Sequence, residues 1–184
     1  MIKRIINKLK KEYHLRILHE DAMDYQIQQM RATGYVIGRE CKIYSQLGTT
    51  EPYLVEIGDN VTVAGDVVII THDNSVIKVI EGATDTVGKV KIGDNCFIGA
   101  RSTILPGVSI ADNTIVAAGS VVTKSVEKEG MIIGGNPARI ISRWGDYSQK
   151  VQQNCFNFDG KNSEERKQEI MAHREKYIVR PIVK

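Results

Sequence analysis

A six-residue period in the aliphatic residues constrains the fold of this chain more than any other feature. From Ile92 onward, six successive hexads begin with Ile or Val: IGDNCF, IGARST, ILPGVS, IADNTI, VAAGSV and VTKSVE. Earlier hexads begin at Ile57, Val63 and Ile69, and a further pair at Ile37 and Ile43. A helix has a period of 3.6 residues and a strand a period of 2, so neither produces this pattern.

A period of six instead indicates short strands joined by turns, each strand pointing one aliphatic residue inward. Three such strands, and hence three hexads, make one coil. The pairs Asp94-Asn95 and Asp112-Asn113 also recur at a spacing of three hexads. Stacked coils would bury aligned columns of Ile and Val, as in other solenoids. A β-sandwich with fortuitous spacing is the alternative, and the two phased runs of Ile and Val argue against it.

The repeats are interrupted directly after a histidine. From Ile69 to Ile92 the chain runs for nearly four hexads, although three would complete one coil, so a loop over residues 73–91 must leave the stack beside His72. Surface loops tolerate insertions, and a neutral insertion is one interpretation. Long loops beside a candidate catalytic residue more often shape a site, which is the interpretation that we favour.

The two flanks carry helical patterns. Residues 2–33 place apolar residues at helical spacing with Lys on the other face, and the pattern ends at Gly34. We expect a helix that caps the open end of the solenoid; an amphipathic helix on anionic lipid is the alternative. Residues 162–177 predict a second helix with Ser163 as its N-cap. The expected organisation is a helical cap over 1–34, the repeat domain over 35–141 and a helical extension over 142–184.

Composition excludes several classes of protein. The net charge of +3 is small and the few aromatic residues do not alternate with a basic stripe, so no nucleic-acid partner is expected. The cysteines Cys41, Cys96 and Cys155 are far apart, which predicts neither a disulfide framework nor a zinc site and fits a cytoplasmic protein. The basic N-terminal segment lacks the apolar run of a signal peptide, and no stretch is apolar enough to span a membrane.

Residues 57–141 resemble the hexapeptide-repeat acyltransferases, in particular the galactoside and maltose O-acetyltransferases. The resemblance rests on the hexads, the single histidine before the loop, the segment AAGSVVTK and the closing GNPAR. It implies an all-β solenoid, a left-handed parallel β-helix with an extruded loop, plus the N- and C-terminal helices. It also implies acetyl transfer from acetyl-CoA without a metal, in a homotrimer whose active sites lie between subunits.

The resemblance places His72 at the position of the family's catalytic histidine. An acceptor hydroxyl is a poor nucleophile, and an imidazole with a pKa near 6.5 can take its proton at neutral pH. The activated oxygen would attack the thioester directly, with no covalent enzyme intermediate. Asp73 is a candidate to orient the ring, and a backbone carbonyl is an equal candidate because neighbours on a strand point to opposite faces.

The resemblance also supplies candidates for binding the two substrates. Candidates along the path of coenzyme A are Ala100, Ala118, Thr123 and Pro137. Those suited to its phosphates are Lys124 and Arg139, with Arg143 as a further charge. Phe97 matches the position of an aromatic residue that faces the acceptor. Weaker candidates for acceptor contacts are Tyr44, Ser45 and Glu56.

The expected acceptor is a sugar hydroxyl of a surface-polysaccharide or nucleotide-sugar intermediate. The alternatives are an antibiotic of the streptogramin or chloramphenicol type, or the amine of an aminosugar. A zinc carbonic anhydrase of the same fold needs three histidines, and the repeats contain only His72. A serine acetyltransferase would carry a large N-terminal helical domain that this chain lacks. A non-enzymatic scaffold would not require His72, Lys124 and NPAR together.

Overall fold

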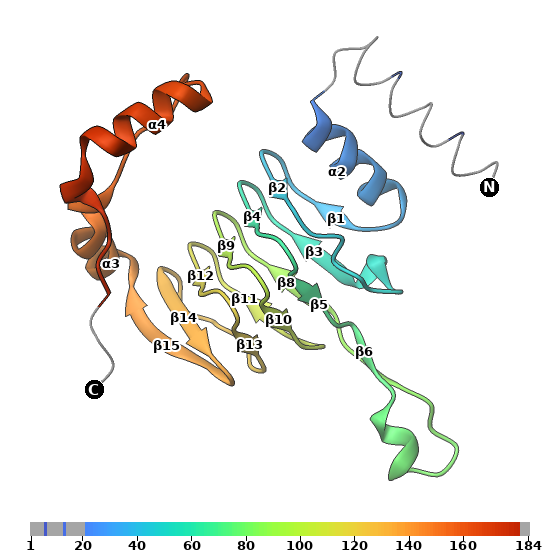
Figure 1. Ribbon diagram of the computed structural model, residues 1–184. Helices are drawn as coiled ribbons and strands as arrows, with labels where there is room; N and C mark the ends of the chain where they lie inside the picture. Colours follow the sequence, from blue (N-terminus) through green and yellow to red (C-terminus); the bar gives the residue numbers. More distant parts are fainter. Residues whose placement is uncertain (1–5, 7–12, 14–20, 181–184) are drawn as a thin grey trace. The chain divides into compact units, whose positions relative to one another are not determined.

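The computed structural model describes residues 6, 13 and 21–180, and the chain divides into two compact units, Met1–Ser142 and Arg143–Lys184 (Figure 1). The first unit holds the hexads, and the second holds the C-terminal helices. No helix within the described residues is long and apolar enough to cross a membrane.

The first unit contains three sheets, in which the strands of successive coils pair in parallel. The first sheet contains β1 (Val36–Ile37), β3 (Val55–Ile57), β8 (Val90–Ile92) and β11 (Ser109–Ile110), in that order. The second contains β2 (Lys42–Ile43), β4 (Thr62–Val63), β9 (Phe97–Ile98), β12 (Ile115–Val116), β14 (Met131–Gly135) and β15 (Ala138–Arg143). The third contains β5 (Val68–Ile69), β10 (Thr103–Ile104) and β13 (Val121–Val122).

The chain visits these sheets in turn, because β8, β9, β10 and β11 belong to the first, second, third and again the first sheet. Phe97 pairs with Ile115, and Thr103 pairs with Val121, so each partner lies three hexads further on. The strand register therefore confirms the predicted coil of three hexads. Figure 1 shows the coils stacked one upon another, from β1 and β2 at one end to β14 and β15 at the other.

The first residues of the hexads form the centre of the core. Each short strand exposes one side chain and buries the next, so that one aliphatic residue per strand points inward. The buried columns contain Ile57, Ile92 and Ile110 from the first sheet, Val63, Ile98 and Val116 from the second, and Ile69, Ile104 and Val122 from the third. Removing this aligned apolar surface from water is the main stabilisation of the stack.

Three corners join the sheets. Residues 44–46, 64–67, 99–102 and 117–120 form the corner between the second and third sheets. Residues 70–72, 105–108 and 123–125 form the corner between the third and first sheets. At the remaining corner, Asp94 N donates to Asp112 Oδ1 at 2.8 Å, and Asn95 Nδ2 donates to Asn113 Oδ1 at 2.7 Å. This ladder between coils explains why the Asp-Asn pair repeats.

The predicted loop leaves the stack as a hairpin. Its two strands, β6 (His72–Asp73) and β7 (Thr86–Val87), pair antiparallel, and the short 3₁₀ helix η2 (Ser75–Lys78) follows β6. Figure 1 shows this hairpin projecting away from the coils below β5. His72 is therefore the point at which the chain departs from the stack.

The flanks form helices, with one correction. The helix α2 (Ala22–Ala32) contacts β1 and β2 and ends at Thr33 before Gly34, as predicted; residues 2–20 lie outside the described residues apart from 6 and 13. The second unit contains α3 (Trp144–Val151), η3 (Gln152–Asn154), α4 (Ser163–Ala172) and η4 (Arg174–Lys176). Ser163 is not the N-cap of α4, because Asn162 caps this helix in a reciprocal box with Glu165.

Candidate active site

His72 lies half-exposed at the base of the projecting hairpin, facing a carboxylate from an earlier coil. Its side chain is 39% exposed, and its Nδ1 lies 2.8 Å from Glu51 Oε2. Glu51 comes from the turn before the short 3₁₀ helix η1 (Pro52–Leu54). The pairing of Leu47 with Val68 explains the approach, since Glu51 and His72 each follow these partners by four residues.

Threonine hydroxyls hold the Glu51 carboxylate from two sides. Thr71 Oγ1 donates to Oε2 at 2.6 Å, and Thr50 Oγ1 donates to Oε1 at 2.7 Å. Thr71 is buried, and its hydroxyl also contacts that of Thr49. The Glu51 backbone N–H donates to Thr49 Oγ1 at 3.2 Å. The carboxylate is therefore fixed in position at both of its oxygens.

These bonds determine the charge states of the pair. Hydrogen bonds from Thr71, Thr50 and His72 lower the pKa of Glu51 to about 2, so its carboxylate is ionised at neutral pH. The hydrogen bond to Glu51 in turn raises the pKa of His72 above its ordinary value of 6.5. An ionised carboxylate only accepts hydrogen bonds, so Nδ1 of a neutral ring carries the proton. Nε2 then has a free lone pair, and no described residue hydrogen-bonds to it.

The prediction that Asp73 orients His72 is wrong, and the alternative of a backbone carbonyl is wrong as well. Asp73 Oδ1 accepts a hydrogen bond from the Ser75 N–H at 2.8 Å, which closes the first turn of the hairpin and lowers the pKa of Asp73. Glu51 occupies the position at Nδ1. A strict count of three hexads back from His72 reaches Leu54, whereas the coil from Leu47 to Val68 is three residues longer than that. The pairing between those two residues is the signal that would have found Glu51.

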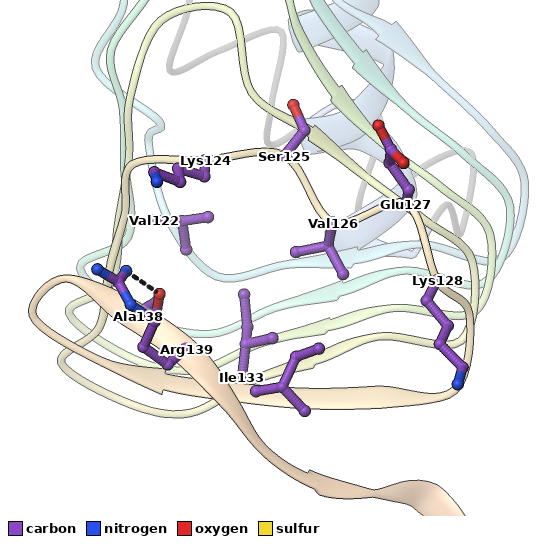
Figure 2. A pocket seen from close by; sticks show the side chains of 10 residues that line it. Val122, Lys124, Ser125, Val126, Glu127, Lys128, Ile133, Ala138 and Arg139 are labelled. Atoms are coloured by element: carbon purple, nitrogen blue, oxygen red, sulfur yellow. Dashed lines mark hydrogen bonds between the residues drawn. The ribbon is translucent and has the colours of Figure 1, made fainter.

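A second cluster lies at the last coil, where two predicted phosphate ligands meet. Lys124 and Arg139 line a cavity of about 550 Å³, and Figure 2 shows them on the same side of it. Its floor is apolar and is formed by Val122, Val126 and Ile133 (Figure 2). Other side chains at the cavity are Ser125, Glu127, Lys128, Ala138 and Ile140. Arg139 Nη1 donates to the Ala138 carbonyl, and neither Lys124 nor Arg139 forms an ion pair with a described residue.

The two clusters share one corner of the coil. Ile69, Ile104 and Val122 are in register across the third sheet, so the residues that follow them stack at the corner between the third and first sheets. His72 and Lys124 therefore lie at the same corner, two coils apart. Neighbouring strands are spaced by about 4.8 Å, which separates the two residues by roughly 10 Å along the stack. Thr123 lies at this corner as well.

Other predicted residues stack at a different corner. Ala100 and Ala118 are in register, since Phe97 pairs with Ile115 and each alanine follows by three residues. Both lie at the corner between the second and third sheets, on the far side of the third sheet from His72. Tyr44 lies at the same corner, largely exposed, beside a cavity of about 490 Å³. Phe97 is partly exposed on the outer face of the second sheet.

Four further candidates have surroundings of their own. The Ser45 hydroxyl is buried, donates to the Ala64 carbonyl at 2.6 Å and accepts from the Val67 N–H at 2.8 Å. The prediction that it contacts an acceptor is wrong because the backbone occupies it. Glu56 lies on the first sheet and pairs with Lys89 at 2.5 Å. The two remaining candidates are Pro137, in a cis peptide bond between β14 and β15, and Arg143, the first residue of the second unit.

Comparisons with known proteins identify the family. The family model described as hexapeptide repeat of succinyl-transferase matches residues 89–124. Protein CapG of Staphylococcus aureus is 38% identical over 159 residues, which cover 84% of this chain and 86% of CapG. The galactoside O-acetyltransferase of Escherichia coli is 33% identical over 60% of this chain, and the match covers 54% of that enzyme. This chain belongs to the hexapeptide-repeat acetyltransferase family.

Solved structures agree with this assignment. A maltose O-acetyltransferase from Clostridium difficile matches with a TM-score of 0.52 and 30% identity, covering 67% of this chain and 77% of that one. A hexapeptide-repeat acetyltransferase from Vibrio cholerae, 20% identical with a TM-score of 0.53, supports the fold alone and covers 77% and 92% of the two chains. The family predicted from the hexads and the closing motif is confirmed, and the protein is an acyltransferase of this family.

Proposed function

We propose that this acetyltransferase moves an acetyl group from acetyl-CoA to a hydroxyl of a sugar, with His72 as general base. The observation that carries the proposal is the His72 ring, whose Nε2 is unpaired among the described residues and which shares a corner with the basic cavity at Lys124 and Arg139. The similarity to a galactoside and a maltose O-acetyltransferase supports the choice of a sugar hydroxyl.

In the proposed reaction, His72 Nε2 takes the proton of the acceptor hydroxyl as its oxygen attacks the thioester carbonyl. The tetrahedral intermediate then collapses, the carbon–sulfur bond breaks, and the imidazolium of His72 gives its proton to the leaving sulfur. An ester and free coenzyme A are the products. No enzyme side chain becomes acetylated, because the acceptor oxygen itself attacks the thioester.

The residues at the last coil fit the donor. Lys124 offers a point charge and Arg139 a planar guanidinium, and both suit phosphate oxygens. The apolar floor of Val122, Val126 and Ile133 offers a surface for the adenine ring. The roughly 10 Å between Lys124 and His72 lies within the reach of an extended pantetheine arm. Pro137 and Arg143 are further proposed contacts.

The division of the donor path between two corners supports an oligomer. Ala100 and Ala118 lie across the third sheet from His72 and Lys124, so one subunit offers only part of the path. We propose a homotrimer of left-handed parallel β-helices, in which one copy places its Ala100 and Ala118 corner against the His72 corner of the next. Phe97 and Tyr44 would then face the acceptor from the neighbouring copy.

Acceptor profiling tests this function. We expect release of the coenzyme A thiol with a panel of hydroxyl sugars, including galactosides, maltose and nucleotide sugars, and mass spectrometry should find an ester that mild base cleaves. A base-stable amide on an aminosugar would assign N-acetylation instead, and activity restricted to a streptogramin would assign antibiotic modification. If no acceptor released thiol and calorimetry detected no binding of coenzyme A, the chain would be a scaffold.

A further inference from the structure

Glu51 is the only acidic residue within the described structure that hydrogen-bonds to the candidate base. The charges of Asp85 and Asp73 also raise the pKa of His72, but neither residue hydrogen-bonds to the ring. Glu51 touches Nδ1 at 2.8 Å and is itself held by Thr50 and Thr71. Only one of these three carboxylates can therefore determine which ring nitrogen carries the proton.

We propose that Glu51 is a positioning residue, which keeps the proton of neutral His72 on Nδ1 and turns Nε2 toward the acceptor, and that Thr50 and Thr71 hold Glu51 for this task. The inference rests on the proposed function, since it concerns how the same base is prepared. Its physical basis is that the hydrogen bond at one imidazole nitrogen decides the protonation of the other. In a neutral ring protonated at Nε2, the free lone pair would lie on Nδ1, and Nε2 could not take the proton of a hydroxyl.

An irregular coil makes this contact possible. The coil from Leu47 to Val68 is three residues longer than the regular three hexads, and the turn that it contains includes Thr49, Thr50 and Glu51. That turn places two hydroxyls and a carboxylate next to Thr71 and His72 on the following coil. Thr71 is buried, so its hydroxyl has no competing water, and its bond to Glu51 Oε2 fixes the oxygen that meets Nδ1.

The test compares two neutralising substitutions. Glu51→Gln keeps the size of the side chain and removes the charge, and we expect kcat to fall about 100-fold while KM for acetyl-CoA changes less than about 2-fold. Asp73→Asn removes a charge next to His72 and keeps the acceptor for the Ser75 N–H; we expect a fall of less than about 3-fold. Glu51→Asp should recover part of the loss, because it restores an anion one methylene shorter.

The pH profile separates positioning from a general loss of structure. Glu51 raises the pKa of His72, so the wild-type rate should rise with pH through a value above 6.5, as the ring loses its proton. In Glu51→Gln this limb should move to lower pH, with a lower plateau. A purely structural role would lower the plateau and leave the position of the limb unchanged.

A spectroscopic measurement tests the inference without activity. The ¹⁵N shifts of the His72 ring should report the Nδ1–H tautomer in the wild-type protein and a shift of population toward Nε2–H in Glu51→Gln. If that variant does not fold, Thr71→Val carries the test, with an expected fall in kcat of about 10-fold and a mixed tautomer. Wild-type turnover or an unchanged tautomer in the variant would overturn the role of Glu51 while leaving the proposed acetyl transfer intact. Conversely, a wild-type protein that acetylates no acceptor would contradict the proposed function. The ring spectra would still show whether Glu51 determines the tautomer of His72.

Discussion

At the scale of single residues, the cavity of the last coil joins two cations to an apolar floor. Lys124 and Arg139 have no ion-pair partner among the described residues, so a phosphate would not have to displace a carboxylate. Charge-assisted hydrogen bonds to phosphate are roughly twice as strong as neutral ones. Such a site should therefore contribute to the affinity for the donor and little to the chemical step.

Replacing Lys124 or Arg139 should weaken the binding of a donor that carries phosphates and spare a donor that lacks them. We expect Lys124→Ala and Arg139→Ala each to weaken the binding of coenzyme A by about 10- to 100-fold in calorimetry, the loss of one charged hydrogen bond. Acetyl-pantetheine lacks every phosphate, so its KM should stay within about 2-fold of the wild-type value. Lys42→Ala, in β2 at the opposite end of the same sheet from Arg139, serves as a matched control. An equal loss of affinity for acetyl-pantetheine would show that the two residues do not bind the phosphates.

Sequence reasoning reached some of these residues and missed others for identifiable reasons. His72, Lys124 and Arg139 stand in local motifs, and the last two line one cavity. Glu51 was missed because an irregular coil hides its register with His72. Asp73 misled because adjacency along the chain does not place a side chain beside its neighbour's ring. Ser45 misled because the repeat pattern does not reveal which hydroxyls the backbone uses.

At the scale of the elements, neighbouring coils stack so closely that the position of Gly93 has no room for a side chain. A Cβ on Gly93 would lie 2.1 Å from Asp112 Oδ1 and 2.7 Å from the Asp112 N, and this Oδ1 accepts the hydrogen bond from the Asp94 N–H that joins the two coils. Gly65 lies at a different corner, where an added Cβ would meet no atom beyond its chain neighbours within 4 Å. The small residues of the hexads thus serve different purposes at different corners.

These two glycines make a matched pair. Gly93→Ala should lower the free energy of unfolding by about 2 kcal/mol or more, because the backbone of the next coil must move to admit the methyl group. Gly65→Ala should change the same quantity by less than about 1 kcal/mol, or raise it by restricting the unfolded chain. Urea denaturation of both variants measures the difference; similar values would show that the coils are not packed as described.

At the scale of the whole molecule, the period of six was enough to predict three strands per coil and the buried columns, because every coil repeats the same contacts with its neighbours. The excess length between Ile69 and Ile92 predicted the projecting hairpin. The period contains no information about which residue the irregular coil from Leu47 to Val68 places beside His72. It also contains no information about the acceptor substrate. The trimer and the left-handed coil stay predictions, since both come from the family and not from the spacing of the residues.

The central claim is that His72 removes the acceptor's proton. The most direct measurement is the rate of thiol release by His72→Ala with the best acceptor, compared with the wild-type protein at the same pH. Sedimentation should first show that both proteins have three times the chain mass of 20.5 kDa, so that assembly is not the variable. The account predicts a fall in kcat of about 10²- to 10⁴-fold, the contribution of a general base. Turnover at the wild-type rate in His72→Ala would contradict it.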